Sequence, residues 1–389
     1  MHQENEKLIF LSFWEMSIDK IQLYKEIGEI PYWLSIIYGY KGIIDDFSDP
    51  DINLDFFRTI RLHNYHMRPG ILKNITKFLY LFKMAKKIDI LYLLHISPGN
   101  LLRMIVYRLG RGKGKIYLKL DMSPCGIFPP KSPLLLENMD IKRKLFHKIF
   151  KKMPDIYTVE TKKAYQEIAG SYYADLIKNE KLYLMPNGFD PLILVENNVQ
   201  RKSVYEKEKI IITVGRIGTY QKNSELLLEI FADIDLKNWK LYIVGSIESN
   251  FMSKIDEFYL NNPDKKESVI FTGSINQKDL YEYYNKSRIF ILTSRHESFG
   301  FVLAEAAYMN NYIISTNTGI AEELLEITNG FVTDIHKKEP FISELKKIIG
   351  MSDDEINKLV PDTDKKEITW EWILKNNEGI KKLCQLPEN

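Results

Sequence analysis

The stretch Arg295-His-Glu-Ser-Phe-Gly-Phe-Val-Leu-Ala-Glu-Ala-Ala307 decides the fold, together with the apolar run Arg288-Ile-Phe-Ile-Leu-Thr293 that precedes it. The apolar run is typical of a buried strand, so the order is strand, Gly-containing turn and helix. A helix that begins at such a turn presents free backbone N–H groups and the positive end of its dipole. This arrangement suits a phosphate or the polar edge of a sugar.

Two carboxylates in this stretch, Glu297 and Glu305, lie eight residues apart. If both were helical, the rise per residue would separate them by roughly 12 Å. A carboxylate accepts one hydroxyl on each oxygen, which suits a vicinal diol. The pattern therefore favours a ligand with hydroxyls at both ends and phosphate in the middle, such as a nucleotide-sugar. The alternative is an amphipathic helix with two solvated glutamates.

Length and composition limit the class of protein. A chain of 389 residues is typical of two domains. Its apolar residues form no run of the ~18 that a membrane span needs, and its first residues are polar and acidic, unlike a signal peptide. Two distant cysteines, Cys125 and Cys384, fit a reducing compartment. We therefore expect a cytoplasmic protein, with the inner face of the cell membrane as an open alternative.

Charge is distributed unevenly along the chain. The net charge is +2, but residues 1–190 contain 29 Lys and Arg against 21 Asp and Glu. Between Arg58 and Lys119 there are 14 basic residues and one acid, Asp89. Such an asymmetry can mark a surface for an anionic partner. Nucleic acid is not expected as that partner, because no recognisable nucleic-acid-binding module or motif accompanies the charge.

Apolar runs alternate with helical patterns in both halves of the chain, which predicts an α/β protein with two doubly wound, Rossmann-like parallel sheets. Residues 32–40 fit a strand or a helix equally well, and Asn100 and Asn223 are expected as helix N-caps. The expected strands are residues 8–13, 88–94, 115–120, 155–159, 209–214, 239–244, 268–271, 288–293 and 312–315.

The turn cluster that ends at Pro191 and the polar segment after it suggest where the domains divide. We expect a first domain over 1–190, a linker over 191–208, a second domain over 209–365, and a terminal helix over 366–389 that crosses back to the first domain. In such folds ligands bind beyond the carboxyl ends of the strands. The two domains are expected to face a cleft.

A second loop with charge follows the strand expected at 209–214. Gly215, Arg216 and Lys222 lie between that strand and the next helix, where a guanidinium and an ammonium favour a diphosphate. The loop matches neither the Walker pattern nor GxGxxG, so a nicotinamide cofactor is not expected. No metal-ligand spacing occurs among the histidines, and Asp233-Ile-Asp235 is interpreted as solvated. His95, which ends a strand, is either a cleft residue or a structural histidine.

These motifs together resemble the GT-B fold glycosyltransferases, and most closely the retaining enzymes of glycosyltransferase family 4. The resemblance is strongest between Met185 and about Leu325. The motifs, in family order, are Pro186-Asn-Gly-Phe-Asp190, Gly215-Arg216 with Lys222-Asn223, Val244-Gly245, Phe271-Thr-Gly-Ser-Ile275, and the E-x7-E pair of Glu297 and Glu305. The loop over 13–19 departs from the family, because it lacks the glycines that many relatives have there.

The resemblance implies a role for each matching residue. Arg216 and Lys222 would hold the donor diphosphate, and Glu305 the ribose hydroxyls. Glu297 would hold the transferred sugar, and His95 would contact that sugar near the reacting carbon. The remaining donor-binding positions that the resemblance implies are Gly215, Gly273, Ser274, Ile275, Ser298, Phe299, Gly300, Phe301 and Val302.

The implied activity is a retaining, metal-independent hexosyl transfer without a cofactor, from a nucleotide-sugar to a glycan or a polyprenyl-diphosphate-linked glycan, in surface polysaccharide biosynthesis. The donor is expected to be a UDP-linked hexose or N-acetylhexosamine. Two alternatives remain open: another GT-B enzyme, such as an inverting transferase or a sugar epimerase, and a catalytically silent partner of a sister transferase. The intact set of Arg216, Lys222, Glu297 and Glu305 argues against the silent partner.

The segment 71–87 has apolar residues at helical spacing and five lysines, which predicts an amphipathic basic helix. Such a helix can lie on an anionic membrane, and peripheral membrane contact is expected from it. The same periodicity is also produced by a helix whose apolar side packs on a sheet.

Overall fold

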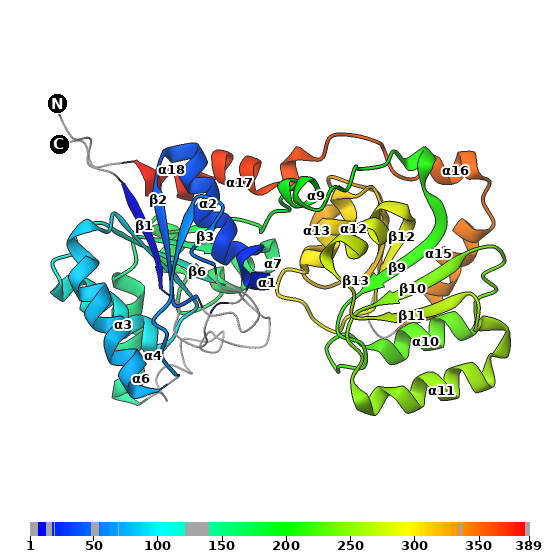
Figure 1. Ribbon diagram of the computed structural model, residues 1–389, viewed down its shortest axis with the longest axis horizontal. Coiled ribbons are helices and arrows are strands. Elements are labelled where there is room, and N and C mark those ends of the chain that lie inside the picture. The colour runs from blue at the N-terminus through cyan, green and yellow to red at the C-terminus, as the bar shows by residue number, and fades with distance from the viewer. Residues whose placement is uncertain are drawn as a thin grey trace. The chain divides into compact units, whose positions relative to one another are not determined.

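Figure 1 shows the computed structural model, which describes residues 7–12, 18, 20–47, 54–68, 70–120, 140–333 and 337–385. Two compact units divide the chain. The first unit combines residues 1–190 with 370–389, and the second contains residues 191–369. Most of the loop over 13–19, as well as Cys125, lies outside the described residues.

The first unit is built on an eight-stranded sheet with the order β3-β4-β2-β1-β5-β6-β7-β8. Every neighbouring pair is parallel except β3 with β4. The strands are β1 (Leu8–Ser12), β2 (Lys41–Asp45), β3 (Phe56–Phe57), β4 (Ile60–His63), β5 (Ile90–Leu94), β6 (Lys115–Leu120), β7 (Ile156–Val159) and β8 (Leu182–Leu184).

Helices cover both faces of this sheet (Figure 1). One buried cluster joins the sheet to α3, α4, α6, α7 and α8, while α17 packs against α2 and α18. The helices of the unit are α1 (Lys20–Leu23), α2 (Glu26–Tyr38), α3 (Ile71–Met84) with η1 (Ala85–Lys87), α4 (Pro98–Leu109), α6 (Ile141–Lys152), α7 (Lys162–Ala169), α8 (Asp175–Lys178), α17 (Trp370–Asn376) and α18 (Glu378–Cys384).

The second unit contains a six-stranded, all-parallel sheet with the order β11-β10-β9-β12-β13-β14. Its strands are β9 (Glu208–Val214), β10 (Lys240–Val244), β11 (Val269–Gly273), β12 (Ser287–Leu292), β13 (Tyr312–Thr316) and β14 (Gly330–Thr333). Its helices are α9 (Leu192–Glu196), η2 (Val204–Glu206), α10 (Ser224–Ala232), η3 (Ser249–Phe251), α11 (Met252–Asn261), η4 (Pro263–Lys265), α12 (Gln277–Lys286), α13 (Phe301–Tyr308), α14 (Ala321–Leu324), α15 (Glu339–Ile349), α16 (Asp353–Asn357) and η5 (Lys366–Ile368).

The parallel α/β architecture predicted from the alternating pattern is confirmed, and some local expectations are corrected. The ambiguous segment 32–40 is helical through Tyr38. Ser97, not Asn100, caps α4, because the Asn100 amide is used to bind the carbonyls of Leu94 and His95. Asn223 occupies the N-cap position of α10 with a left-handed backbone, but its side chain makes no capping bond.

Residues 191–208, expected as a linker, form α9 and η2. Val204 is 5% exposed and belongs to the core of the second unit. At the other end of the chain, the second unit ends at Thr369, and the main-chain N–H of Trp370 donates to the carbonyl of Phe189 at 3.1 Å. The segment from Trp370 onward therefore completes the first unit.

Helix α3 turns two of its lysines toward the protein and most of its large apolar residues toward the solvent. Lys73 and Lys77 are only 5% and 3% exposed. Their ammonium groups contact the two carboxylate oxygens of the buried Asp46 at 2.6 and 2.8 Å. Burial lowers the pKa of Lys77, and the Asp46 carboxylate opposes that shift. The helix is thus held both by these buried ion pairs and by Leu81, which packs in the core of the sheet.

Asp46→Asn tests this attachment. Two buried ammonium groups would lose their carboxylate, so we expect the helix to be destabilised by about 3 kcal/mol. Hydrogen exchange followed by mass spectrometry should then show the amides of α3 exchanging roughly a hundredfold faster. Asp233→Asn is the matched control, because it removes the surface pair between Asp233 and Lys338, which solvent screens, and it should leave the exchange of α3 unchanged. If both variants changed the exchange of the α3 amides equally and only slightly, Asp46 would not be what holds α3 to the first unit.

Candidate functional site

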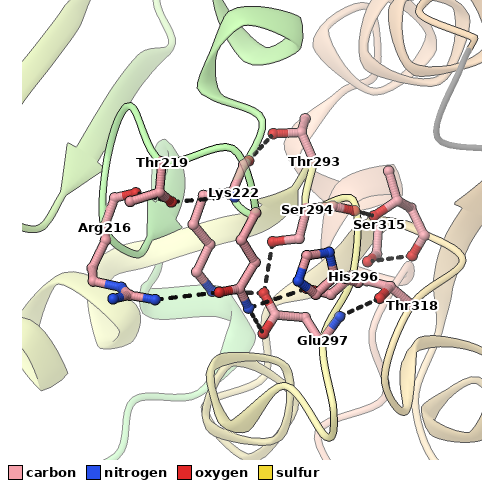
Figure 2. A network of polar contacts seen from close by, with 11 residues as sticks. Arg216, Thr219, Lys222, Thr293, Ser294, His296, Glu297, Ser315 and Thr318 are labelled. Carbon is pink, nitrogen blue, oxygen red and sulfur yellow. Dashed lines mark hydrogen bonds and ion pairs between the residues drawn. The ribbon is translucent and has the colours of Figure 1, made fainter. Parts of the chain in front are cut away.

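Loops that follow β9, β11, β12 and β13 meet at the carboxyl edge of the second sheet, because parallel strands all end at the same edge. Glu297 lies in the loop between β12 and α13 and is 8% exposed. Lys222 comes from the loop after β9, and its ammonium donates to Glu297 Oε1 at 2.6 Å. Figure 2 shows this ion pair at the centre of a polar network.

Two further donors fix the Glu297 carboxylate. Ser294 Oγ donates to Oε1 at 2.7 Å, and the Gln221 amide donates to Oε2 at 3.3 Å (Figure 2). The side-chain oxygen of Gln221 in turn accepts from the exposed Arg216 guanidinium at 3.3 Å. Arg216, Lys222 and Glu297, which the sequence predicted to share a site, are therefore brought together. Lys222 contacts the Glu297 carboxylate directly, and Arg216 is linked to it through the Gln221 side chain.

The turn after Glu297 leads into α13. Gly300 has a left-handed backbone, with φ at 87°, and the helix begins at Phe301, so the predicted strand–turn–helix order is confirmed. Glu297 precedes this helix and is not helical, which removes the basis of the 12 Å separation expected from helical rise. The loop after β13 supports the turn, because Thr318 Oγ1 accepts the Glu297 N–H at 2.6 Å and the Ile320 N–H donates to the Phe299 carbonyl at 2.9 Å.

Glu305 lies on α13 and contacts two tyrosines of α12. The Tyr284 hydroxyl donates to one carboxylate oxygen at 2.9 Å, and the Tyr281 hydroxyl donates to the other at 3.4 Å. Burial raises the pKa of Tyr284 well above its ordinary value, and the adjacent Glu305 charge adds to the shift. Tyr284 therefore remains a neutral donor. The sequence analysis missed this pair, although two tyrosines three residues apart on a predicted helix share one face.

The remaining positions implied by the resemblance lie in loops that follow strands of the same sheet, and on α13. Gly215 follows β9 directly, and Gly273 ends β11 with a left-handed backbone. Ser274 is exposed and Ile275 is half-buried in the short segment between β11 and α12. The positions of the turn and the first helical turn, Ser298, Phe299, Gly300, Phe301 and Val302, are partly or fully buried.

His95 belongs to the first unit, where it directly follows β5. Its backbone is left-handed, with φ at 64°, a conformation that costs energy for a residue with a side chain. The Asn100 amide donates to its carbonyl at 2.9 Å, and its own N–H donates to the carbonyl of Lys119 at 2.9 Å. The position at the ligand edge of a parallel sheet agrees with the prediction, while its role stays a prediction.

A polar cluster that sequence reasoning missed lies at the carboxyl ends of β1, β2 and β4. Asp45 is fully buried and accepts from Tyr65 at 2.6 Å and from Ser12 at 3.3 Å, and it lies 3.3 Å from His63 Nδ1. Arg103 on α4 donates to Ser12 Oγ at 2.7 Å, and burial lowers its pKa to about 10. The cluster had one signal in the sequence, the acidic pair Asp45-Asp46 directly after an apolar segment.

No group of three or more metal-ligating side chains occurs among the residues that the structure describes. Asp233 instead pairs with Lys338 at the surface at 3.0 Å, and Asp235 accepts the main-chain N–H of Lys237 at 3.0 Å. Both interactions agree with the interpretation of this D-x-D as solvated.

Residues 195–360 match the family model "Glycosyl transferases group 1". The second unit belongs to this glycosyltransferase family. The sequence resemblance based on the E-x7-E stretch is thereby confirmed, because Glu297, Glu305, Arg216 and Lys222 all lie within the matched residues.

Individual relatives agree with this family. The amylovoran biosynthesis glycosyltransferase AmsD of Erwinia amylovora is 33% identical over 151 residues, which are 37% of this chain and 39% of that protein. The capsular polysaccharide biosynthesis glycosyltransferase CapM of Staphylococcus aureus is 26% identical over 192 residues, covering 46% of this chain and 48% of the relative. The chain thus spans less than half the length of both curated relatives.

The likeness to solved structures extends over nearly the whole chain. Anabaena HepE, crystallised in complex with UDP and glucose, superposes with a TM-score of 0.61 at 15% identity, and the match covers 95% of this chain and 97% of that one. At this identity the likeness concerns the fold alone. The chain has the GT-B fold, with two Rossmann-like units, as the sequence resemblance implied.

Gly319→Ala tests how tightly the turn before α13 is supported. Gly319 has φ at 56°, and an added Cβ would lie 2.2 Å from the Phe299 carbonyl oxygen. We expect a loss of stability of at least about 2 kcal/mol, measured by thermal unfolding, because backbone strain and a main-chain clash combine. Gly350→Ala is the control, since its Cβ would meet nothing closer than 3.4 Å at a negative φ. An unchanged unfolding temperature for Gly319→Ala would show that the loop after β13 can move away from the loop after β12 at little cost.

Proposed function

We propose that this protein is a retaining glycosyltransferase that moves a hexose or N-acetylhexosamine from a UDP-sugar to a glycan or a polyprenyl-diphosphate-linked glycan. The observation that carries the proposal is that Arg216, Lys222 and Glu297 converge at one edge of the second sheet. Glu297 lies just before α13, the helix that contains Glu305. The name of CapM refers to capsular polysaccharide biosynthesis and that of AmsD to amylovoran biosynthesis, which supports a surface polysaccharide as the product.

The donor diphosphate is assigned to Arg216 and Lys222. Without ligand, the Lys222 ammonium is neutralised by Glu297 at 2.6 Å. A bound diphosphate would give this cation a second anionic partner and would leave Glu297 free to accept hydroxyls of the transferred sugar. Glu305, whose position the two α12 tyrosines fix, would accept the ribose hydroxyls. Fixed cations that meet the charge developing on the leaving phosphate are a strong source of catalysis.

The transfer step proposed here needs no covalent enzyme intermediate. The bond between the anomeric carbon and the phosphate oxygen breaks, and the acceptor oxygen forms its bond to the same carbon from the same face. The acceptor proton passes to the departing phosphate oxygen. An α-linked donor then gives an α-linked product, without metal. His95 would contact the donor sugar near the reacting carbon.

The acceptor is assigned to the first unit. The buried cluster of Asp45, His63, Tyr65 and Arg103 at the carboxyl edge of its sheet offers fixed hydrogen-bonding groups for a saccharide. A polyprenyl-linked acceptor lies in a bilayer, so peripheral contact with an anionic membrane at the inner face of the cell membrane belongs to the same proposal. Among the described residues no helix is long and apolar enough to cross a membrane.

Calorimetry with UDP tests the donor site. We expect Glu305→Ala to weaken UDP binding by at least about tenfold, because charge-assisted hydrogen bonds to the ribose are lost. Glu282→Ala, which removes a carboxylate from the neighbouring α12, should leave the affinity unchanged. Turnover of a panel of UDP-hexoses and UDP-N-acetylhexosamines would then identify the sugar. A wild-type chain that binds neither UDP nor any member of the panel would favour the silent-partner alternative.

Tyr284→Phe tests the support of Glu305. The carboxylate would lose its hydrogen bond at 2.9 Å and become less fixed, so we expect UDP affinity to fall by about fivefold with little change in stability. Tyr283→Phe is the matched control, because that ring packs on Tyr242 and its hydroxyl makes no contact with Glu305 among the described residues. If both variants bind UDP like the wild type, the tyrosine has no part in positioning Glu305.

A further inference from the structure

Helix α3 carries a stripe of large apolar side chains on its outer side. Ile71, Leu72, Ile75, Leu79 and Phe82 are between 48% and 78% exposed. The spacing of these residues follows the helical repeat, so they share one side, opposite to the buried Lys73 and Lys77. A helix that only packs on a sheet would show the reverse arrangement, with apolar residues inside and lysines outside.

The neighbouring helices extend this stripe into a surface. Helix α3 packs beside α4, and α4 packs beside α6, on one face of the first sheet (Figure 1). We define the apolar face as the exposed residues Ile71, Leu72, Ile75, Leu79, Phe82, Leu102, Ile105, Leu109, Ile141 and Leu145. An exposed apolar patch of this extent marks an interaction surface rather than ordinary surface variation.

The charge on these helices has one sign. No acidic residue occurs within α3, η1, α4 or α6. Exposed basic residues follow or flank the apolar ones, namely Lys83, Lys86, Lys87, Arg111, Lys113, Lys142, Arg143, Lys144, Lys148 and Lys152. Apolar side chains within a dense field of positive charge complement the boundary between acyl chains and anionic headgroups. The central part of a protein–protein interface, by contrast, is depleted of lysine.

We propose that the apolar face docks onto the surface of an anionic phospholipid bilayer. The apolar side chains of α3 and α4 enter the acyl boundary, while the basic residues of α6 and of the end of α3 contact phosphate-containing headgroups. Lys73 and Lys77, which pair with the buried Asp46, lie on the side of α3 opposite to the apolar stripe. The inference deepens the proposed function, since it names the surface that would bring the first unit to a bilayer-held acceptor.

Vesicle flotation with the full chain tests this docking. The probes are vesicles of phosphatidylcholine alone and of phosphatidylcholine with phosphatidylglycerol, at low and high salt. We expect binding to the anionic vesicles that weakens as salt rises, because headgroup attraction is screened. UDP calorimetry on the same samples reports the donor site separately. Vesicle binding without UDP binding would contradict the proposed function but support the docking face.

The variant Ile71→Ser/Ile75→Ser/Leu79→Ser removes apolar area from the centre of the stripe. We expect its partition onto anionic vesicles to fall by at least about a hundredfold, with UDP affinity unchanged. Ile36→Ser is the matched control, because Ile36 is 52% exposed on α2, outside the apolar face, and should bind vesicles like the wild type. Lys142→Gln/Arg143→Gln/Lys144→Gln should reduce binding by about tenfold or more on anionic vesicles only.

Three outcomes would overturn the proposal. The first is a wild-type chain that floats with neither kind of vesicle at low salt. The second is a triple-serine variant that binds anionic vesicles as strongly as the Ile36→Ser control. The third is a wild-type dimer in light scattering that becomes monomeric in the triple-serine variant while vesicle binding is absent, which would assign the face to a second copy of the chain.

Discussion

The ion pair between Lys222 and Glu297 is the constraint on which the candidate donor site depends. It joins the loop after β9 to the loop after β12, two strands that are neighbours in the sheet but about 70 residues apart along the chain. The pair forms because parallel strands deliver both loops to one edge. It holds a nearly buried carboxylate in a defined position without a ligand, so a ligand meets a prepared site rather than two mobile loops.

The sequence contained enough information for the fold and for the chemical groups of the site. Parallel strands that are buried on both faces have continuous apolar sequences, and for this reason β9, β10, β12 and β13 could be predicted from the sequence. The segments that escaped prediction, such as β4 with the sequence Ile60–His63 and β8 with Leu182–Leu184, are too short to show a period. The charged residues of the site were found because their spacing is characteristic of a family.

Contacts between side chains distant in the chain could not be predicted. The sequence placed Glu297 and Lys222 in one site but assigned them to different parts of a ligand, whereas the structure pairs them directly. A similar limit applies to α3. Its periodicity indicated an amphipathic helix, but the side that faces the sheet depends on Asp46, a residue beyond the helix whose carboxylate is buried with the lysines. Hydrophobic periodicity shows that a helix has an apolar side and a polar side, but the residues that it packs against determine which side is buried.

The segment from Trp370 onward belongs to the first unit, and this affects how the protein can fold while it is being translated. Helix α17 packs on α2, and the Asn377 amide donates to the carbonyl of Leu184 at 2.8 Å. Residues made after the whole second unit therefore cover part of the first unit's sheet. A nascent chain cannot complete the first unit as it leaves the ribosome, whereas the second is contiguous in sequence and can. The first unit, although it is made first, cannot be completed before the second has been made, and its sheet stays partly uncovered until the segment from Trp370 onward has been added.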